Sequence, residues 1–348
     1  MNINKTSPVL VTGANGYVAS WVVKKLLDDG LTVHAAVRDP SNKEKVGHLE
    51  KMAATSKGKI VFFKADLLTQ GSYLKAMDGC ELVYHMASPF VIRGITDANK
   101  QLIEPALEGT RNVLNSVNNT SSVKRVVLTS SVAAVFGDAK EALKVGSDGF
   151  TEEHWNSTSR IDHQPYDYSK LLAEKEAWAI NRNQNRWDMV VLNPGLIFGP
   201  SFTQQSASTS LSIIRELANG GLKKGVPNID LFMVDVRDVA TAHIKAGFTT
   251  TAKGRHILVS NTMPMLDVAK MLKEQYPQYP FPKKEVPKLL IWLLGPKTGM
   301  DREYIRKNVG YRLQFNNRYA KQDLGIKFRP IGQTMSDHLE QMIADGVI

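Results

Sequence analysis

Residues 8–19 have the sequence Pro-Val-Leu-Val-Thr-Gly-Ala-Asn-Gly-Tyr-Val-Ala, a short apolar run followed at once by two closely spaced glycines. The apolar run predicts a buried parallel strand, and the pattern that continues to Leu27 predicts a helix. Between them, Gly13 permits a tight turn, Gly16 lets the backbone approach a ligand, and Ala19 lets the helix pack on its strand. Amides at the start of such a helix bind phosphate groups. The stretch therefore predicts a dinucleotide-binding turn.

The second apolar run, at residues 32–37, ends at Arg38. NAD-binding sites usually place an acidic residue here to hold the ribose 2′-hydroxyl, whereas an arginine accommodates the 2′-phosphate of NADP. Lys45, on the helix that follows, is a second candidate contact. Asp39 should point away from Arg38, because side chains alternate at a strand end. These residues predict NADP(H), and around the turn the cofactor candidates are Thr12, Gly13, Asn15, Gly16, Tyr17 and Val18.

Further apolar runs alternate with helical segments, at residues 59–64, 81–85, 124–129, 188–192 and 255–259, with a long helix at 99–118. This alternation predicts an α/β fold with a Rossmann-type doubly wound parallel sheet. Ligands bind at the carboxyl ends of the strands in such sheets. The residues that follow the strands are therefore further cofactor candidates: Asp66, Leu67, Met86, Ala87, Ser88, Thr129, Asn193, Pro194, Gly195 and Leu196.

The strand–helix alternation loosens after Pro200. We predict a dinucleotide-binding domain over residues 1–200, to which residues 235–262 return. Residues 201–234 and 263–348 are predicted to form a smaller substrate-binding lobe over the carboxyl edge of the sheet. Gly220–Gly225 has the spacing of a phosphate loop, but Val226 stands where the lysine should be, so this motif is rejected.

Composition excludes several other classes of protein. The 348 residues are 43% apolar and 22% charged, as in globular proteins, and Cys80 is the only cysteine. No signal peptide is apparent and the apolar run at 289–294 is too short to cross a membrane, so we expect a cytoplasmic protein. The net charge of +10 is concentrated between residues 283 and 329, without a nucleic-acid motif. We interpret it as a solvated basic face and expect no nucleic-acid or membrane partner.

Residues 164–174, Gln-Pro-Tyr-Asp-Tyr-Ser-Lys-Leu-Leu-Ala-Glu, predict a helix that begins at Pro165. Tyr166 and Lys170 are four residues apart and share one face of that helix, which Tyr168 does not. A free tyrosine has a pKa of about 10, and a nearby ammonium favours the phenolate. We therefore predict that Lys170 lowers the pKa of Tyr166.

The glycine turn, the sequence Thr129-Ser130-Ser131 after a strand, and Tyr166 with Lys170 together resemble the extended short-chain dehydrogenase/reductases. Residues 37–40, 63–67, 78–80 and 193–200 are similar to the dihydroflavonol 4-reductase group, with cinnamoyl-CoA reductases and microbial aldehyde and ketone reductases. The resemblance implies that Ser131, Tyr166 and Lys170 are catalytic. Tyr166 would donate a proton, Ser131 would bind the carbonyl oxygen, and Lys170 would also bind the nicotinamide ribose.

The chain departs from two subgroups of that family. Phe136 occupies the position, five beyond the serine, where plant dihydroflavonol reductases have a polar residue, and the cinnamoyl-CoA reductase signature around the tyrosine is missing. We therefore predict an NADPH-dependent aldehyde or ketone reductase with an apolar pocket formed by Phe90, Phe136, Tyr166 and Phe202.

Two other functions stay open. One is an NAD-retaining nucleotide-sugar epimerase or dehydratase, which Arg38 disfavours. The other is a non-catalytic NADP-binding redox sensor, which the Tyr166–Lys170 pair disfavours. The eight histidines show no metal-ligand spacing, so no metal is predicted. We expect a small carbonyl compound as the binding partner, and a monomer or homodimer.

Overall fold

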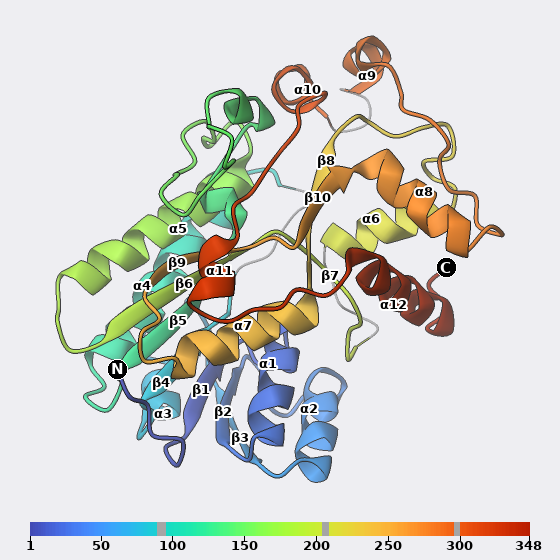
Figure 1. The fold of residues 1–348 in the computed structure, drawn as a ribbon. Helices are drawn as coiled ribbons and strands as arrows, with labels where there is room; N and C mark the ends of the chain where they lie inside the picture. Colours follow the sequence, from blue (N-terminus) through green and yellow to red (C-terminus); the bar gives the residue numbers. More distant parts are fainter. Residues whose placement is uncertain (89–94, 204–208, 296–299) are drawn as a thin grey trace.

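The computed structural model describes residues 1–88, 95–203, 209–295 and 300–348. Its centre is a seven-stranded parallel sheet with helices on both faces (Figure 1). The strand order is β3-β2-β1-β4-β5-β6-β9, so the order reverses between β1 and β4, where dinucleotides bind in such sheets. The strands are β1 (Val9–Thr12), β2 (Thr32–Val37), β3 (Lys59–Lys64), β4 (Leu82–His85), β5 (Arg125–Thr129), β6 (Asp188–Pro194) and β9 (Gly254–Leu258). The predicted fold class is confirmed.

Two apolar cores cover the two faces of this sheet. Val9 and Val11 of β1 belong to one core and Leu10 to the other, because successive side chains of a strand point to opposite faces. Helices α1 (Tyr17–Asp28), α2 (Lys43–Thr55) and α7 (Val236–Phe248) close the first core. Helices α3 (Leu74–Met77), α4 (Glu104–Asn118) and α5 (Pro165–Arg182) close the second.

The helix predicted at residues 99–118 has two parts. Its first turn, Asn99–Ile103, is a π-helix, and α4 begins only at Glu104. Pro105 stands in the first turn of α4. Proline has no N–H to donate to the carbonyl of the preceding turn, so regular α-helical bonding starts afresh there.

A second, smaller sheet lies beside the first. It contains β7 (Leu196–Phe198), β8 (Asp230–Asp235) and β10 (Asn261–Pro264) in the order β10-β8-β7. β8 is antiparallel to β10 and parallel to β7. Around this sheet pack α6 (Thr209–Ala218), α8 (Met265–Gln275) and α12 (Ile331–Ala344), as Figure 1 shows. This sheet was not predicted from the sequence, because its strands lie outside the regular alternation of strands and helices that indicated the central sheet.

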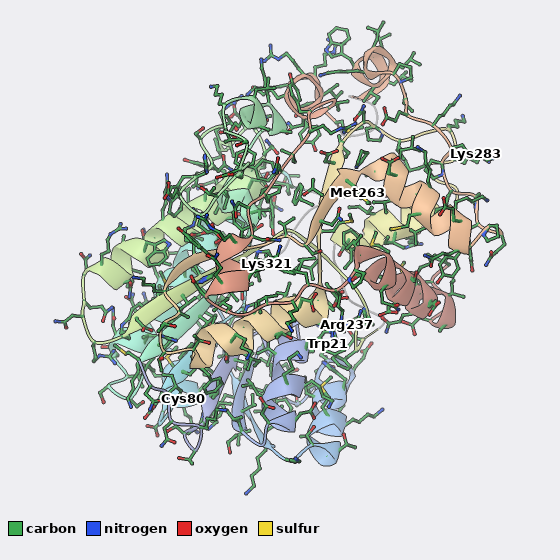
Figure 2. All side chains as sticks on the ribbon, viewed as in Figure 1. Trp21, Cys80, Arg237, Met263, Lys283 and Lys321 are labelled. Carbon is green, nitrogen blue, oxygen red and sulfur yellow. The ribbon has the colours of Figure 1, made fainter. Side chains whose placement is uncertain are left out.

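The apolar run near residue 290 forms the short helix α9 (Lys288–Leu294), which α10 (Arg302–Asn308) and α11 (Arg318–Gln322) follow. No helix within the described ranges combines the length and the apolarity that a membrane crossing requires. Cys80 is fully buried in the core beside α3, as Figure 2 locates it. Burial raises the pKa of its thiol to about 12, so it stays protonated.

Candidate active site

A cavity of about 400 Å³ opens at the carboxyl ends of the central strands. Most of the predicted site residues line it: Gly13, Gly16, Tyr17, Val18, Met86, Ser88, Thr129, Ser131, Phe136, Tyr166, Lys170, Pro194, Gly195 and Leu196. They come from the turn between β1 and α1, from the start of α1, from the ends of β5 and β6 and the segments after β4, β5 and β6, and from α5. The fold thus brings the glycine turn and the tyrosine–lysine pair to one place.

The glycine turn is built for a close approach of two strand ends. Gly13 has φ +63°, and a Cβ there would lie 3.0 Å from Cα of Ala87. The Thr12 hydroxyl oxygen accepts hydrogen bonds from the amides of Met86 (3.0 Å) and Ala87 (2.9 Å). Helix α1 then starts after Gly16 without a side-chain cap. Its first amides are therefore suited to bind a phosphate group.

Gly13→Ala tests this arrangement. The added Cβ combines a strained backbone with a contact that Ala87 cannot relieve, so the turn must shift relative to the α1 amides. We expect NADPH affinity in a fluorescence titration to fall by about tenfold or more, the effect of roughly 1.4 kcal/mol. Gly254→Ala is the matched control, since Gly254 has φ +79° but an added Cβ there would meet nothing within 4 Å. Equal NADPH affinity for both variants would contradict the close-approach argument.

The end of strand β2 lies beside a separate open cavity. The lining of that cavity includes Asn15, Arg38, Lys45 and Phe202. The Asp39 carboxylate accepts hydrogen bonds from the amide (2.9 Å) and hydroxyl (2.6 Å) of Ser41. Asp39 and Arg38 both line this cavity, but the Asp39 carboxylate is engaged by Ser41 within its own turn.

The predicted substrate-pocket residues do not stay together. Phe136 and Tyr166 line the central cavity, but Phe202 packs on Trp21, with the ring centroids 4.3 Å apart, and lines the cavity beside Arg38 instead. Figure 2 locates Trp21. Its indole N–H donates to the carbonyl of Pro200 (2.8 Å), which holds the start of this segment against α1. Phe90 lies outside the described residues.

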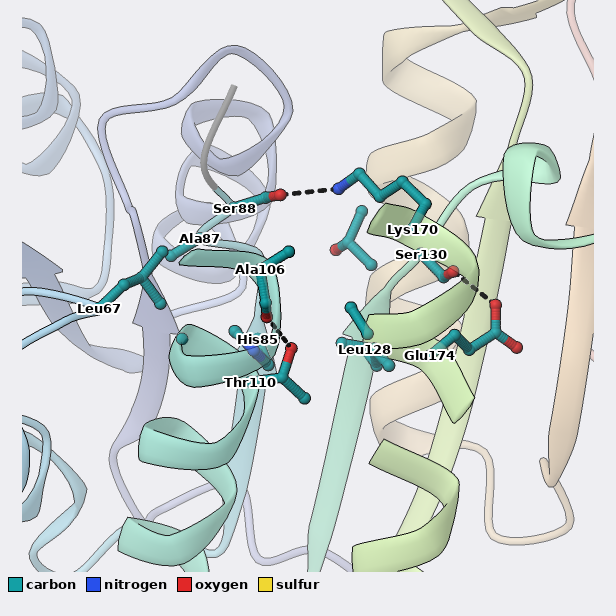
Figure 3. A pocket seen from close by; sticks show the side chains of 13 residues that line it. Leu67, His85, Ala87, Ser88, Ala106, Thr110, Leu128, Ser130, Lys170 and Glu174 are labelled. Carbon is teal, nitrogen blue, oxygen red and sulfur yellow. Dashed lines mark hydrogen bonds between the residues drawn. The ribbon is translucent and has the colours of Figure 1, made fainter. Parts of the chain in front are cut away.

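Helix α5 positions Tyr166 and Lys170. Gln164 precedes it with φ 55°, the only positive φ of a non-glycine residue in the described chain, and Pro165 starts the helix. The Lys170 ammonium donates to the Ser88 hydroxyl at 2.7 Å, the contact drawn in Figure 3. The Ser131 hydroxyl oxygen accepts from the amide of Ala133 (3.1 Å). Because a hydroxyl has one proton and two lone pairs, Ser131 can still donate into the cavity.

The electrostatics of the pair differ from the sequence-based prediction. Burial raises the pKa of Tyr166 above its ordinary value, and the neighbouring Asp167 acts in the same direction. Lys170 does not offset this, because its ammonium is turned to Ser88 and lies 5.7 Å from the centroid of the tyrosine ring. Burial lowers the pKa of Lys170 to about 8. The phenol is therefore protonated at neutral pH, the form that a proton donor requires.

Four predicted cofactor residues lie behind or beside the cavity. Leu67 and Ala87 line a small cavity behind Lys170. The Asp66 carboxylate accepts from the amide of Leu68 (2.8 Å). Asn193 is fully buried, and its amide group donates to the carbonyl of Ser131 (3.0 Å). Asn193 therefore supports Ser131 from below.

Glu174 organises the layer under the predicted catalytic residues. Its carboxylate accepts from Ser130 Oγ (2.5 Å), Asn193 Nδ2 (2.8 Å) and Arg255 Nε (2.6 Å). Figure 3 shows the bond to Ser130 close to Lys170. One buried carboxylate thus joins α5 to the ends of β5 and β6 and to β9. Glu174 was not among the residues predicted from the sequence, although it follows Lys170 by one helical turn.

The model of the NAD dependent epimerase/dehydratase family matches residues 9–259. The chain belongs to this family. Cinnamoyl-CoA reductase CAD2 of Medicago truncatula is 42% identical over 284 residues, which cover 81% of this chain and 84% of that protein. Tetraketide alpha-pyrone reductase 1 of Arabidopsis thaliana is 33% identical over 98% of this chain and 96% of that protein. The structure of yeast methylglyoxal/isovaleraldehyde reductase Gre2 complexed with NADPH has a TM-score of 0.78 and 30% identity, covering 98% of this chain and 100% of that one.

These relatives confirm the predicted resemblance to extended short-chain dehydrogenase/reductases of the dihydroflavonol 4-reductase group. In this member of the family, the cavity wall also contains residues that were not predicted from the sequence, among them Asp167, Ile197, Ser210 and Phe232. Asp167 could have been predicted, because it directly follows Tyr166 in the sequence. Phe232 comes from the overlooked strand β8, so nothing in the pattern placed it near the catalytic residues.

Proposed function

We propose that this chain reduces aldehydes or ketones with NADPH and that Tyr166 is the proton donor. The observation that supports it best is the single cavity onto which the glycine turn, Ser131, Tyr166 and Lys170 all open. The family relatives are reductases, so the chain is an oxidoreductase of the predicted class.

The structure offers three features that fit NADP(H). The uncapped start of α1 suits the pyrophosphate, and Gly13 leaves no side chain between that helix and Ala87. Arg38 and Lys45 line the cavity at the end of β2, and the Asp39 carboxylate accepts a hydrogen bond from the Ser41 amide. A cationic strand end suits a 2′-phosphate and does not suit a free 2′-hydroxyl. Lys170 lies where it can bind the nicotinamide ribose.

The bound cofactor would supply the hydride to the carbonyl carbon. As negative charge develops on the carbonyl oxygen, Tyr166 would give its phenolic proton to that oxygen, and the Ser131 hydroxyl would donate a hydrogen bond to it. Burial helps in two ways: it keeps the phenol protonated beforehand, and it strengthens the hydrogen bonds by excluding water.

The walls of the cavity favour a compact carbonyl compound. Phe136 is nearly fully buried and packs on Phe150, Phe232 and Phe315, with ring centroids 5.2–5.4 Å apart. An aromatic cluster of this kind binds apolar groups and offers no hydrogen-bond partner to flavonoid hydroxyls. Simple aldehydes, ketones and α-ketoesters are therefore the proposed substrates. Because relatives include cinnamoyl-CoA reductases, hydroxycinnamoyl thioesters belong in the test panel.

An NADPH-oxidation screen with purified protein tests the proposal. The panel comprises aldehydes, α-ketoesters, cyclic ketones, flavanonols and hydroxycinnamoyl-CoA thioesters, each with NADPH and with NADH. Reduction of an aldehyde or ketone by NADPH supports the proposal. If only the thioesters are reduced, aldehydes and ketones are not the substrates and the proposed substrate class is wrong. NAD that stays bound through purification, without net NADPH oxidation, would instead indicate the epimerase or dehydratase alternative.

Arg38→Ser tests the choice of cofactor. A hydrogen bond between charged groups contributes about 1.5–3 kcal/mol, so the ratio of kcat/KM with NADPH to that with NADH should fall by about 10- to 100-fold. Arg182→Ser removes the same charge from the exposed end of α5 and should leave that ratio as in the wild type. A wild-type preference for NADH would overturn the assignment of Arg38 before any variant is made.

A further inference from the structure

Asp167 brings an acidic side chain to the wall of the catalytic cavity. Among the described residues that line this cavity, it is the one with a carboxyl group. It directly follows Tyr166 in the first turn of α5. A substrate whose carbonyl oxygen meets the phenol therefore comes close to this carboxyl group.

The surroundings of Asp167 leave its charge largely uncompensated. No hydrogen bond or ion pair joins it to another described residue, in contrast to its neighbour Asp138. Asp138 accepts from His163 (2.7 Å), Gln164 (3.0 Å) and Asn308 (2.9 Å) and pairs with Lys307 (3.1 Å). These three donors and the Lys307 ammonium therefore bind Asp138 and not Asp167.

The pKa of Asp167 agrees with this arrangement. Burial, and then the charge of Asp138, raise the pKa of the Asp167 carboxyl to about 7. Asp167 in turn raises the pKa of Tyr166, as does burial, and contributes to raising that of Tyr304 to about 12. Two neutral phenols and one carboxylate thus interact with Asp167, and the cation that lines the same cavity, Lys170, directs its ammonium to Ser88.

We propose that Asp167 makes the enzyme selective against carbonyl substrates with a negative charge next to the carbonyl group. In an α-keto acid, the carboxylate is bonded directly to the carbonyl carbon, so it would stand at short distance from Asp167, which lines the same cavity. Like charges at that distance repel strongly. An α-ketoester of the same acid has the same shape at the reacting carbon and no charge. The inference rests on the proposed carbonyl reductase function and specifies its substrate class as uncharged carbonyl compounds.

The experiment compares one ester with its own free acid. The probes are the neutral α-ketoester that wild-type enzyme reduces fastest and the corresponding α-keto acid, each assayed by NADPH oxidation at pH 8. We expect wild type to prefer the ester, and Asp167→Asn to lower the ester-to-acid ratio of kcat/KM by about tenfold or more. Asp167→Glu keeps the charge and should keep the preference. Asp162→Asn, at a side chain 70% exposed, should leave the ratio as it is.

The outcomes separate this inference from the function it rests on. If wild type reduces no ketoester, aldehyde or ketone, the proposed function fails. If wild type reduces the ester and the acid equally well, or if Asp167→Asn keeps the wild-type ratio, the role of Asp167 is overturned while the reductase function stands. Because the ratio is taken within one preparation, partial unfolding of a variant does not affect it, and Asp167→Ser provides a second uncharged variant.

Discussion

Tyr166→Phe is expected to lower kcat/KM for NADPH-dependent carbonyl reduction by about 100- to 10,000-fold, the usual contribution of a positioned proton donor. The substitution removes only the phenolic oxygen, and the ring keeps its place in the cavity wall. NADPH affinity should stay close to that of wild type, because the proposed phosphate contacts come from α1 and the end of β2. Initial rates and a fluorescence titration measure the two quantities separately.

The matched control for this prediction is Tyr168→Phe. Tyr168 lies on the same helix but is not among the residues that line the cavity, so losing its hydroxyl should leave the rate near wild type. If Tyr166→Phe keeps full activity, the proton comes from another group and the proposed role of Tyr166 is wrong. If both variants lose NADPH binding, the two hydroxyls maintain the structure of the cofactor site, and the proposed role of Tyr166 as proton donor is not supported.

Glu174→Ala is expected to destabilise the protein by about 3–5 kcal/mol, because it leaves a buried charge without its partner. Arg255 is only 8% exposed and stacks on Trp155, 4.0 Å from the ring centroid. Without Glu174 it keeps the carbonyls of Glu152 and His154 but loses the carboxylate with which it forms an ion pair. At the same time Ser130 loses its acceptor, and Asn193 keeps only the carbonyl of Ser131. Urea unfolding followed by circular dichroism measures the change.

Glu176→Ala is the control on the same helix. Glu176 pairs with Arg111 at 2.8 Å, but their side chains are 27% and 43% exposed, so this pair should contribute less than about 1 kcal/mol. An equal decrease in the free energy of unfolding in the two variants would show that the buried Glu174 network stabilises the protein no more than an exposed ion pair does. A Glu174→Gln variant keeps the shape of the side chain and should fall between wild type and Glu174→Ala.

The local chemistry of the chain was predictable from short stretches of sequence. The strand of residues 9–12 is apolar on both faces, which only a parallel sheet covered on both sides accommodates. Tyr166 and Lys170 share a helix face through their spacing alone. These features depend on periods of two and 3.6 residues, which neighbouring residues along the chain determine.

What the sequence could not predict depends on contacts between distant elements. Phe136 and Phe202 are both phenylalanines in segments that follow strands. Phe136 packs on Phe232 of β8, whereas Phe202 packs on Trp21 of α1. The pKa of Tyr166 likewise followed from burial and from the direction of the Lys170 ammonium, which spacing does not determine.

The sequence by itself determined the alternation of strands and helices, the glycine turn and the tyrosine–lysine pair, because each element arises from residues that are neighbours along the chain. Only the tertiary structure decided which side chains share the cavity and how Glu174 joins Ser130, Asn193 and Arg255 beneath it. The physical reason is that hydrophobic periodicity specifies which face of an element is buried, but not which distant element covers it.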